Sequence, residues 1–300
     1  MKKILKFILS RKMRFFYLSR LGFYNKVPDD VYIKKEYSLM MNEELNLQKP
    51  ITFNEKLQWL KLYDRKPIYT TMVDKYEAKK YVGDIIGDEY IIPSIGIYDK
   101  FDDINFNELP NQFVIKCTHD SGGIIVCKDK NSFNKKAAKK KINKHLKRKY
   151  YYEHREWPYK NVKPRILVEK YMEDKSGELR DYKVYAFNGK AEYVMLCFDR
   201  FKSETKFIYF DKNWNMKKEF SNDGLKYGES INVERPTSLN KMFEFAEKLS
   251  KGIPFVRVDF YEVNGKLYFG ELTFYPSAGF DNTRTKACQE YLDEALQIDI

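Results

Sequence analysis

The sequence predicts a mixed α+β fold that is built largely from antiparallel hairpins. Two Asn-Gly pairs, at residues 188–189 and 264–265, each separate two strand-like runs, which is the pattern of a β-hairpin with a tight turn. Between these hairpins, residues 238–250 repeat apolar side chains at helical spacing, which predicts an amphipathic helix that packs on a sheet. No internal repeat or low-complexity linker interrupts the 300 residues.

The order of the predicted elements divides the chain into four parts. Residues 1–65 form a predicted helical N-terminal segment, and residues 66–112 form a small α/β unit. Residues 113–172 contain two strands around a glycine turn, then a basic helix and another strand, and residues 173–300 contain the two hairpins and the amphipathic helix. The chain is therefore long enough for one large domain or for two to three intertwined subdomains.

Local signals set the expected limits of the elements. Thr52 and Glu55 have the spacing of a capping box, which predicts a helix start at this point. The tail, residues 281–300, is predicted to be helical and carries no recognisable chemistry. The predicted helices span residues 29–41, 52–62, 71–82, 133–150 and 238–250, and the predicted strands include residues 90–93, 95–98, 113–118, 124–127, 165–171, 181–187 and 191–197.

Charge and composition limit the classes of partner. The formal net charge of +12 favours an anionic partner, and the lysines crowd into residues 135–149. No nucleic-acid-binding motif is present, so we expect no nucleic-acid partner. Three scattered histidines argue against a zinc site. Four widely spaced cysteines without metal-type pairing predict reduced thiols in a cytoplasmic protein: Cys117, Cys127, Cys197 and Cys288.

The first 24 residues mix apolar and basic side chains. The segment lacks the uninterrupted apolar run of a signal peptide, and no stretch of the sequence is apolar enough to span a bilayer. Two interpretations stay open for residues 1–24. One is a basic amphipathic helix in peripheral contact with the anionic inner face of the membrane, and the other is an ordinary helix packed on the protein body.

Three charged side chains near the second hairpin form the most informative pattern in the chain. Arg257 and Asp259 are two residues apart, so they share one face of a predicted strand, and Glu271 ends the neighbouring strand. Two carboxylates and a guanidinium at one end of a sheet suit a divalent metal on a polyphosphate next to an anionic substrate. The alternative is a hairpin that carries an exposed ion pair.

Two further segments suit a nucleotide. Lys116 precedes a turn with Ser121, Gly122 and Gly123, and such a turn presents backbone N–H groups to phosphates while the lysine supplies charge. Taken alone, the turn fits a plain hairpin better than a phosphate-binding loop.

The second segment is the strand that ends near Glu169. Its carboxylate and the following backbone groups suit an adenine base, and Met172 suits packing against the ring. Lys183 lies on one face of a strand together with Asp181, where it would add charge near the phosphates. The alternative for the Glu169 segment is an edge strand with surface charges.

The order of these motifs resembles the ATP-grasp superfamily. Residues 51–61, 74–75 and 116–123 are similar to one branch of it, the TupA-like group of surface-polysaccharide biosynthesis, and the resemblance covers roughly residues 30–280. It implies an ATP-grasp fold, in which ATP is held between two α+β subdomains with Mg²⁺ on its phosphates. It also implies an ATP-dependent carboxylate–amine ligase that forms an acylphosphate and then an amide.

The resemblance also implies a role for each motif residue. The phosphate contacts would be Lys75 and Lys116, with Ser121, Gly122 and Gly123 as the lid; the adenine contacts would be Glu169, Lys170, Tyr171 and Met172; the catalytic cations would be Arg257 and Lys183; and the metal ligands would be Asp259, Glu271 and Thr273. Thr273 departs from the family pattern, which has Asn there, so the second metal is in doubt. His119 either touches phosphate or substrate, or caps the turn.

Three functions stay open at this stage. The first is the ligase, which would join a carboxylate-bearing sugar or an amino acid to an amine. The second is a glycosyltransferase of polysaccharide biosynthesis, although the one adjacent acidic pair, Asp102 and Asp103, lies in a poor context for a nucleotide-sugar site. The third is a non-enzymatic module that binds anionic glycan or membrane. The sequence does not identify the acid or the amine. It also does not give the oligomeric state or a role for residues 199–235.

Overall fold

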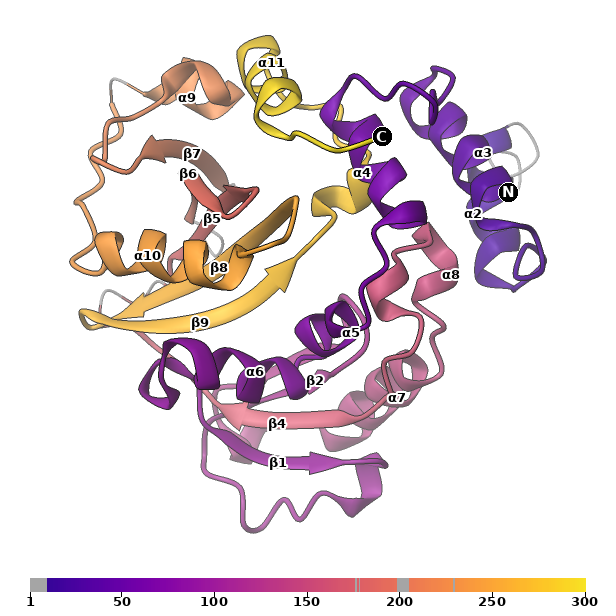
Figure 1. Cartoon of the computed structure of the whole chain (residues 1–300). Helices are drawn as coiled ribbons and strands as arrows, with labels where there is room; N and C mark the ends of the chain where they lie inside the picture. Colours follow the sequence, from indigo (N-terminus) through magenta and orange to yellow (C-terminus); the bar gives the residue numbers. More distant parts are fainter. Residues whose placement is uncertain (1–9, 176, 178, 199–204, 229) are drawn as a thin grey trace.

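The computed structural model describes residues 10–175, 177, 179–198, 205–228 and 230–300, which fold around two antiparallel β-sheets (Figure 1). The four-stranded sheet has the order β1-β4-β2-β3, and the five-stranded sheet has the order β7-β6-β5-β8-β9. The strands are β1 Ser94–Tyr98, β2 Phe113–Cys117, β3 Ile124–Cys127, β4 Ile166–Lys170, β5 Asp181–Phe187, β6 Lys190–Phe198, β7 Lys206–Asp211, β8 Phe255–Val263 and β9 Lys266–Thr273.

Helices flank and separate the two sheets. Figure 1 shows α5 and α6 between the sheets, α10 against the five-stranded sheet, and α2, α3 and α4 together at one side of the molecule. The helices are α2 Arg11–Arg20, α3 Asp29–Met41, α4 Phe53–Tyr63, α5 Ile68–Val73, α6 Glu77–Ile86, α7 Lys135–Leu146, α8 Tyr151–His154, α9 Asn222–Tyr227, α10 Leu239–Ser250 and α11 Lys286–Ala295.

Each sheet has its own apolar core. Helix α10 packs on β5, β6 and β8 because its apolar stripe, which includes Met242 and Ala246, is fully buried. Helix α7 carries mostly exposed lysines but buries Ala138 and Ile142 against the four-stranded sheet. The predicted helix over residues 238–250 is thus confirmed, and the lysine-rich helix is amphipathic.

The two Asn-Gly turns form the predicted hairpins. Strands β5 and β6 pair in antiparallel order around Asn188 and Gly189, and β8 and β9 pair around Asn264 and Gly265. All four turn residues have positive φ angles, between 49° and 84°. This is the left-handed conformation that asparagine and glycine adopt most readily and that a tight hairpin turn requires.

The prediction of one helix over residues 71–82 is wrong, because the helix is interrupted at Asp74: α5 ends at Val73 and α6 begins at Glu77. Asp74 has an extended backbone, and its carboxylate accepts hydrogen bonds from the N–H groups of Tyr76 (2.9 Å) and Glu77 (3.3 Å). An aspartate that bonds to the backbone two and three residues ahead starts a new helix rather than continuing the old one. The break lets the N–H of Lys75 donate to the carbonyl of Thr118 (3.1 Å).

Two other element limits also differ from the prediction. The basic helix ends at Leu146 rather than at residue 150, and a separate short helix, α8, follows it. Residues 90–93 do not form a strand, because a 3₁₀ turn occupies Asp88–Tyr90 and only Ile91 makes an isolated bridge, to Phe269 of the other sheet. The predicted tail helix is present as α11.

The N-terminal helix α2 packs on the protein body. It contacts α3 and α8, and the buried Ser19 hydroxyl hydrogen-bonds to the Tyr32 hydroxyl at 2.6 Å. The part of the predicted amphipathic segment before residue 10 lies outside the described residues. In the described part of the chain, no helix is long and apolar enough to cross a membrane.

Candidate functional site

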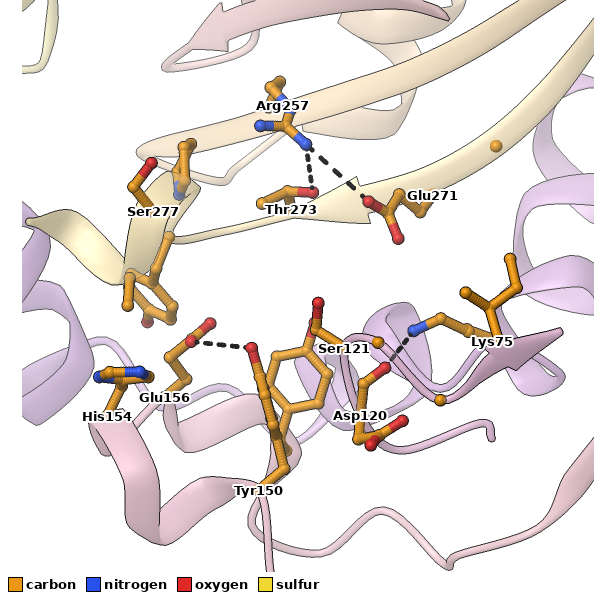
Figure 2. Close-up of a pocket in the computed structure, with 18 of the residues that line it drawn as sticks. Lys75, Asp120, Ser121, Tyr150, His154, Glu156, Arg257, Glu271, Thr273 and Ser277 are labelled. Atoms are coloured by element: carbon orange, nitrogen blue, oxygen red, sulfur yellow. Dashed lines mark hydrogen bonds and ion pairs between the residues drawn. The ribbon is translucent and has the colours of Figure 1, made fainter. Parts of the chain in front are cut away.

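A cavity of about 680 Å³ lies between the two sheets, and most of the predicted site residues line it (Figure 2). These residues come from helix, loop and strand segments that are far apart in the sequence. The predicted residues that line the cavity are Lys75, Lys116, Ser121, Gly122, Gly123, Glu169, Lys183, Arg257, Glu271 and Thr273. The structure does not bring Lys170, Tyr171 and Met172 to the cavity wall, and Asp259 lies directly behind the lining cations.

One wall of the cavity, on the five-stranded sheet, carries a cluster of charged side chains. The strand register brings these side chains together. Lys183 on β5 and Glu271 on β9 both pair with Asp259 on β8, and Thr273 pairs with Arg257. Asp259 is 1% exposed. Its carboxylate accepts hydrogen bonds from Arg257 Nε (2.6 Å), from Arg257 Nη2 (2.7 Å) and from Lys183 Nζ (2.5 Å).

These contacts keep the buried carboxylate charged. Burial by itself raises the pKa of Asp259, but Arg257 and Lys183 outweigh it and hold the pKa below its ordinary value. Arg257 also donates to the hydroxyl of Thr273 at 3.1 Å and lies 3.9 Å from Glu271 Oε1. Asp259 therefore fixes two cations at the cavity surface, and Glu271, at 48% exposure, remains open to the cavity.

The donor set suits magnesium in part. Carboxylate and hydroxyl oxygens are the ligands that Mg²⁺ prefers, and Glu271 and Thr273 share one face of β9. Both oxygens of Asp259 are engaged by cations, so this residue would bind a metal only if Arg257 or Lys183 moved. Within the described ranges, no group of three or more His, Cys, Asp or Glu side chains is arranged to hold a metal ion.

The opposite wall, on the four-stranded sheet, holds a second buried carboxylate between two lysines. Glu169 Oε2 lies 2.5 Å from Lys116 Nζ, and Glu169 Oε1 lies 2.6 Å from Lys79 Nζ. Burial raises the pKa of Glu169, but the two ammonium groups bring it below its ordinary value. Lys79 was missed at the sequence level, because nothing in the sequence of α6 distinguishes it from its neighbour Lys80.

Part of the backbone that was predicted to bind adenine already makes hydrogen bonds within the protein. The N–H of Lys170 donates to the carbonyl of Pro93 at 3.0 Å, so it is not available to a base. Tyr171 and Met172 follow the end of β4 and are partly buried. Of the four predicted adenine contacts, the structure thus brings Glu169 alone to the cavity wall.

The glycine turn is anchored by side chains from just before the start of α6 and from the end of α7. Lys75 Nζ donates to the carbonyl of Asp120 at 2.8 Å, and Arg148 Nη1 donates to the carbonyl of Ser121 at 2.6 Å. The buried Asp120 carboxylate contacts His145 Nδ1 and lies 3.6 Å from Arg148 Nη1. The turn is therefore tied down on both sides while its glycines line the cavity.

Both glycines in this turn are required by their surroundings. Gly122 has a φ of +92°, and a Cβ at Gly123 would lie 2.6 Å from an Asp120 carboxylate oxygen. His119, at 4% exposure, lies outside the cavity and hydrogen-bonds to the Arg148 carbonyl at 3.1 Å. Burial lowers the pKa of His119. His119 thus does not line the cavity, and its ring contacts the backbone that follows α7.

Sequence reasoning missed the residues at the far end of the cavity. Tyr150, His154 and Glu156 line this end, together with the loop that carries Ser277 (Figure 2). His154 Nδ1 lies 2.6 Å from Oε1 of the fully buried Glu36, and the Tyr150 hydroxyl donates to Glu156 Oε1 at 3.4 Å. A weak signal was present, since aromatic and charged residues cluster directly after the basic helix.

The loop at this end has an unusual backbone. Ser277, Ala278 and Gly279 all have positive φ angles, of 51°, 52° and 71°. Non-glycine residues in this conformation cost about 1–3 kcal/mol each and persist only where neighbours hold them. Lys61 Nζ donates to the Ala278 carbonyl and Gln58 Nε2 donates to the Gly279 carbonyl, both at 2.8 Å. Two side chains of helix α4 thus hold this loop in its strained conformation.

Comparisons with known proteins found distant structural likenesses and one family model. Among solved structures, the chain is similar to D-alanine–D-alanine ligase from Bacillus anthracis (15% identity, TM-score 0.42, covering 75% of this chain and 67% of that one) and to the same enzyme in complex with ATP (16%, 0.37, 68% and 54%). It is also similar to L-amino acid ligase from Bacillus licheniformis (13%, 0.48, 81% and 55%). The chain spans between about half and two thirds of the length of these ligases. No curated protein matches it.

A family assignment is clearer than these structural likenesses. The family model described as "TupA-like ATPgrasp" matches residues 55–297, which is most of the chain. This match starts and ends later than the range of roughly 30–280 that the motifs indicated. It confirms the predicted resemblance and, with the two antiparallel sheets and their helices, the predicted α+β fold of the ATP-grasp type. The chain therefore belongs to the TupA-like ATP-grasp family.

Proposed function

We propose that this chain is an ATP-dependent carboxylate–amine ligase that activates an acid as an acylphosphate, joins it to an amine and releases ADP and phosphate. One observation carries this proposal: the Lys116–Glu169 pair of one sheet and the Arg257–Asp259–Glu271 cluster of the other line or border a single cavity. Phosphoryl transfer depends mainly on positioning and charge neutralisation, and this cavity offers fixed cations on two facing walls.

ATP would lie across the cavity from the four-stranded sheet to the five-stranded sheet. Its adenine would contact Glu169 and its phosphates would contact Lys75 and Lys116, whereas Tyr171 and Met172 would reach the adenine only if the segment after β4 moved toward the cavity. The N–H groups of the glycine turn, residues 121–123, would cover the phosphates, because this turn lines the cavity and is anchored at both sides.

Arg257 and Lys183 would act on the transferred phosphoryl group and on the acid. Their common partner Asp259 holds both groups in place before any ligand arrives, so little reorganisation is needed. Glu271 and Thr273 would hold Mg²⁺, which neutralises phosphate charge when bound, and Asp259 would join them only if Arg257 or Lys183 moved away from it. The accessible carboxylate of Glu271 is the feature that supports this metal assignment.

The acid would be a carboxylate-bearing sugar or an amino acid of a surface polysaccharide, which is the setting of the TupA-like group. The glycosyltransferase alternative gains no support from the acidic pair Asp102 and Asp103. Asp102 is exposed and pairs with Lys139 on α7 at 2.6 Å, and neither aspartate lines the cavity between the sheets.

The test is an ADP-release assay with ATP, Mg²⁺ and a panel of acids (L-glutamate, D-alanine, D-glucuronate) combined with a panel of amines (L-glutamate, L-alanine, glucosamine). We expect ADP release that depends on one acid. Glu271→Gln should lower it by about 10²-fold or more, because the proposed Mg²⁺ ligand loses its charge. Glu244→Gln, an exposed change on α10, is the matched control. Turnover of a nucleotide-sugar without ATP would contradict the proposal.

The chain is further proposed to act in the cytoplasm in peripheral contact with an anionic membrane. On α2, Met13 and Tyr17 lie four residues apart and are 42% and 54% exposed, and Leu21, four residues further on, is 57% exposed. Arg11 and Arg20 accompany this apolar stripe. Such a surface suits an interface with acidic lipid headgroups.

Sedimentation with phosphatidylserine vesicles tests this contact. We expect salt-sensitive binding that weakens in Leu21→Glu and is absent with vesicles of phosphatidylcholine alone. Phe207→Glu, which changes an exposed apolar residue on β7, is the matched control and should bind like the wild type. Binding that is equal for both vesicle types would contradict an electrostatic contact.

A further inference from the structure

Amide formation requires a group that removes a proton from the amine. An amine that is protonated at neutral pH cannot attack an acylphosphate until it loses that proton, so a ligase of the proposed type needs a proton acceptor in its cavity. An acceptor that is already paired with a lysine or arginine is a poor base, because the neighbouring cation favours its charged, deprotonated form. The unpaired acceptors of the cavity are therefore the candidates.

Most carboxylates that line the cavity are paired in this way. The pairs are Asp120 with Arg148, Glu169 with Lys79 and Lys116, Asp181 with Lys183, and Glu271 with Arg257. Among the described residues, Glu156 lines the cavity without a lysine or arginine in ion-pair distance, and its one hydrogen-bond donor is the Tyr150 hydroxyl. Its side chain is nearly buried, at 6% exposure, so its carboxylate is poorly compensated.

His154, beside Glu156, has the geometry of an oriented base. Its Nδ1 lies 2.6 Å from Oε1 of Glu36, which is fully buried. Because an ionised carboxylate only accepts hydrogen bonds, Nδ1 is the donor in this contact, and the tautomer that the contact favours has its lone pair on Nε2. Nε2 makes no hydrogen bond within the described ranges, and His154 lines the cavity. A carboxylate that orients an imidazole in this way recurs in acyl-transfer sites.

This end of the cavity is continuous with the Arg257 end. Tyr159 lines the same cavity: burial raises the pKa of its phenol, Glu156 and Glu271 raise it further, and Arg257 lowers it. Figure 2 shows His154 and Glu156 on the wall that faces the loop of Ser277, with Arg257 and Glu271 further along the same cavity. An amine held at Glu156 would thus face an acyl group held at Arg257.

We propose that Glu156 and His154 form the amine-binding subsite, in which Glu156 pairs with the incoming ammonium group and His154 Nε2 removes its proton. Glu36 is the positioning residue that fixes the ring. After His154 takes the first proton, the amine nitrogen forms a bond to the acyl carbon. The bond from that carbon to the phosphate oxygen breaks, its electron pair leaves with phosphate, and the second nitrogen proton goes to the departing phosphate. This inference rests on the proposed ligase function.

Hydroxylamine separates the two half-reactions. It is uncharged at neutral pH, so it traps an acylphosphate as a hydroxamate without needing the base, whereas L-alanine and glucosamine are protonated and do need it. The full chain is incubated with ATP, Mg²⁺ and the acid that gives ADP release, and hydroxamate and amide are measured in parallel. His154→Gln should lower amide formation by about 10²- to 10⁴-fold and leave hydroxamate formation within about twofold.

Two further variants test the other assignments. Glu156→Gln should raise the KM for the amine about tenfold or more and leave hydroxamate formation intact. Glu36→Gln should lower the kcat of amide formation without changing hydroxamate formation. Glu244→Gln is the control that should change neither. Hydroxamate formation also reports that each variant is folded.

The outcomes distinguish the inference from the function on which it rests. Equal loss of hydroxamate and amide in His154→Gln and Glu156→Gln, or no loss of either, would overturn the amine subsite while wild-type hydroxamate formation upholds the ligase. A wild-type chain that forms neither hydroxamate nor ADP with any acid would overturn both.

Discussion

Lys61 is a cation that the fold buries completely. Its ammonium donates to the Ala278 carbonyl and to Gln58 Oε1, both at 2.8 Å, and lies 4.7 Å from the centre of the Phe280 ring. Within the described residues no carboxylate is in ion-pair distance of it. Burial therefore lowers its pKa to about 8, against an ordinary value of 10.5, although Glu36 and Glu156 counteract part of the shift. This lysine supports the strained loop at the amine end of the cavity.

The shifted pKa of Lys61 predicts a pH dependence of stability. Between pH 8 and pH 10.5 the unfolded chain keeps a proton on Lys61 that the folded chain has lost, so the free energy of unfolding rises with pH in this window. Below pH 8 Lys61 is protonated in both states, and the folded chain carries the whole cost of burying the ammonium group. Relative to Lys61→Met, the free energy of unfolding of the wild type should rise by up to roughly 3 kcal/mol, at about 1.4 kcal/mol per pKa unit. Urea denaturation across the window measures it.

Taking the difference between wild type and Lys61→Met removes the contribution of the many tyrosines that titrate in the same range. The exposed change Lys140→Met on α7 is the matched control and should give a difference that does not vary with pH. A flat difference for Lys61→Met as well would show that Lys61 keeps its proton in the folded state, and that the buried ammonium is stabilised more strongly than its contacts indicate.

At the scale of elements, helix α4 connects the fold to the site. Its start is the predicted capping box: Thr52 Oγ1 accepts from the Glu55 N–H at 3.3 Å, and Glu55 Oε2 accepts from the Thr52 N–H at 2.9 Å. One and two turns later the same helix presents Gln58 and Lys61 to the left-handed loop Pro276–Gly279. The position of this loop thus depends on where α4 begins.

Removing the cap should destabilise the whole chain. Thr52→Ala is expected to lower the free energy of unfolding by about 1 kcal/mol, because the N–H of Glu55 loses its acceptor. Thr52→Ser keeps a hydroxyl at the same place and should stay close to the wild type. Chemical denaturation compares the three chains. A loss of equal size in both variants would assign the effect to the threonine methyl group instead of the cap.

Elements that depend on local signals were predictable, and contacts between distant segments were not. The alternation of residues 255–260 and the turn at Asn264 placed Arg257, Asp259 and Glu271 on one face, and the structure has them there. The break at Asp74 was missed because its cause includes tertiary contacts: Arg165, 91 residues away, donates to its carboxylate at 2.8 Å.

The same reasoning explains which site residues escaped prediction. Glu36 and His154 meet across 118 residues, and Lys79 reaches Glu169 from a different element, so no local pattern links either pair. The motif residues that line the cavity were identified by family resemblance and strand periodicity together. The residues at the amine end, in contrast, match no motif and became visible only through burial and pairing in the folded chain.

At the scale of the whole molecule, each sheet supplies one wall of the cavity. Lys116 and Glu169 belong to the four-stranded sheet, and Lys183, Arg257 and Glu271 belong to the five-stranded sheet. The described chain links the walls through α5 and α6, which lie between the sheets, and through the bridge from Ile91 to Phe269 (Figure 1). A ligand that contacts both walls would add a further link that only the folded chain provides.

Nucleotide binding should therefore stabilise the whole chain. A ligand that binds only the folded state, at 100 times its dissociation constant, adds about 2.7 kcal/mol, which raises the melting temperature by several degrees. We expect this shift with a non-hydrolysable ATP analogue and Mg²⁺, measured for each variant against its own nucleotide-free form. Lys116→Met should abolish most of it, because the proposed phosphate contact is lost, whereas Lys140→Met should keep it. A wild-type melting temperature that no nucleotide changes, or a full shift in Lys116→Met, would show that the two walls do not meet around a triphosphate.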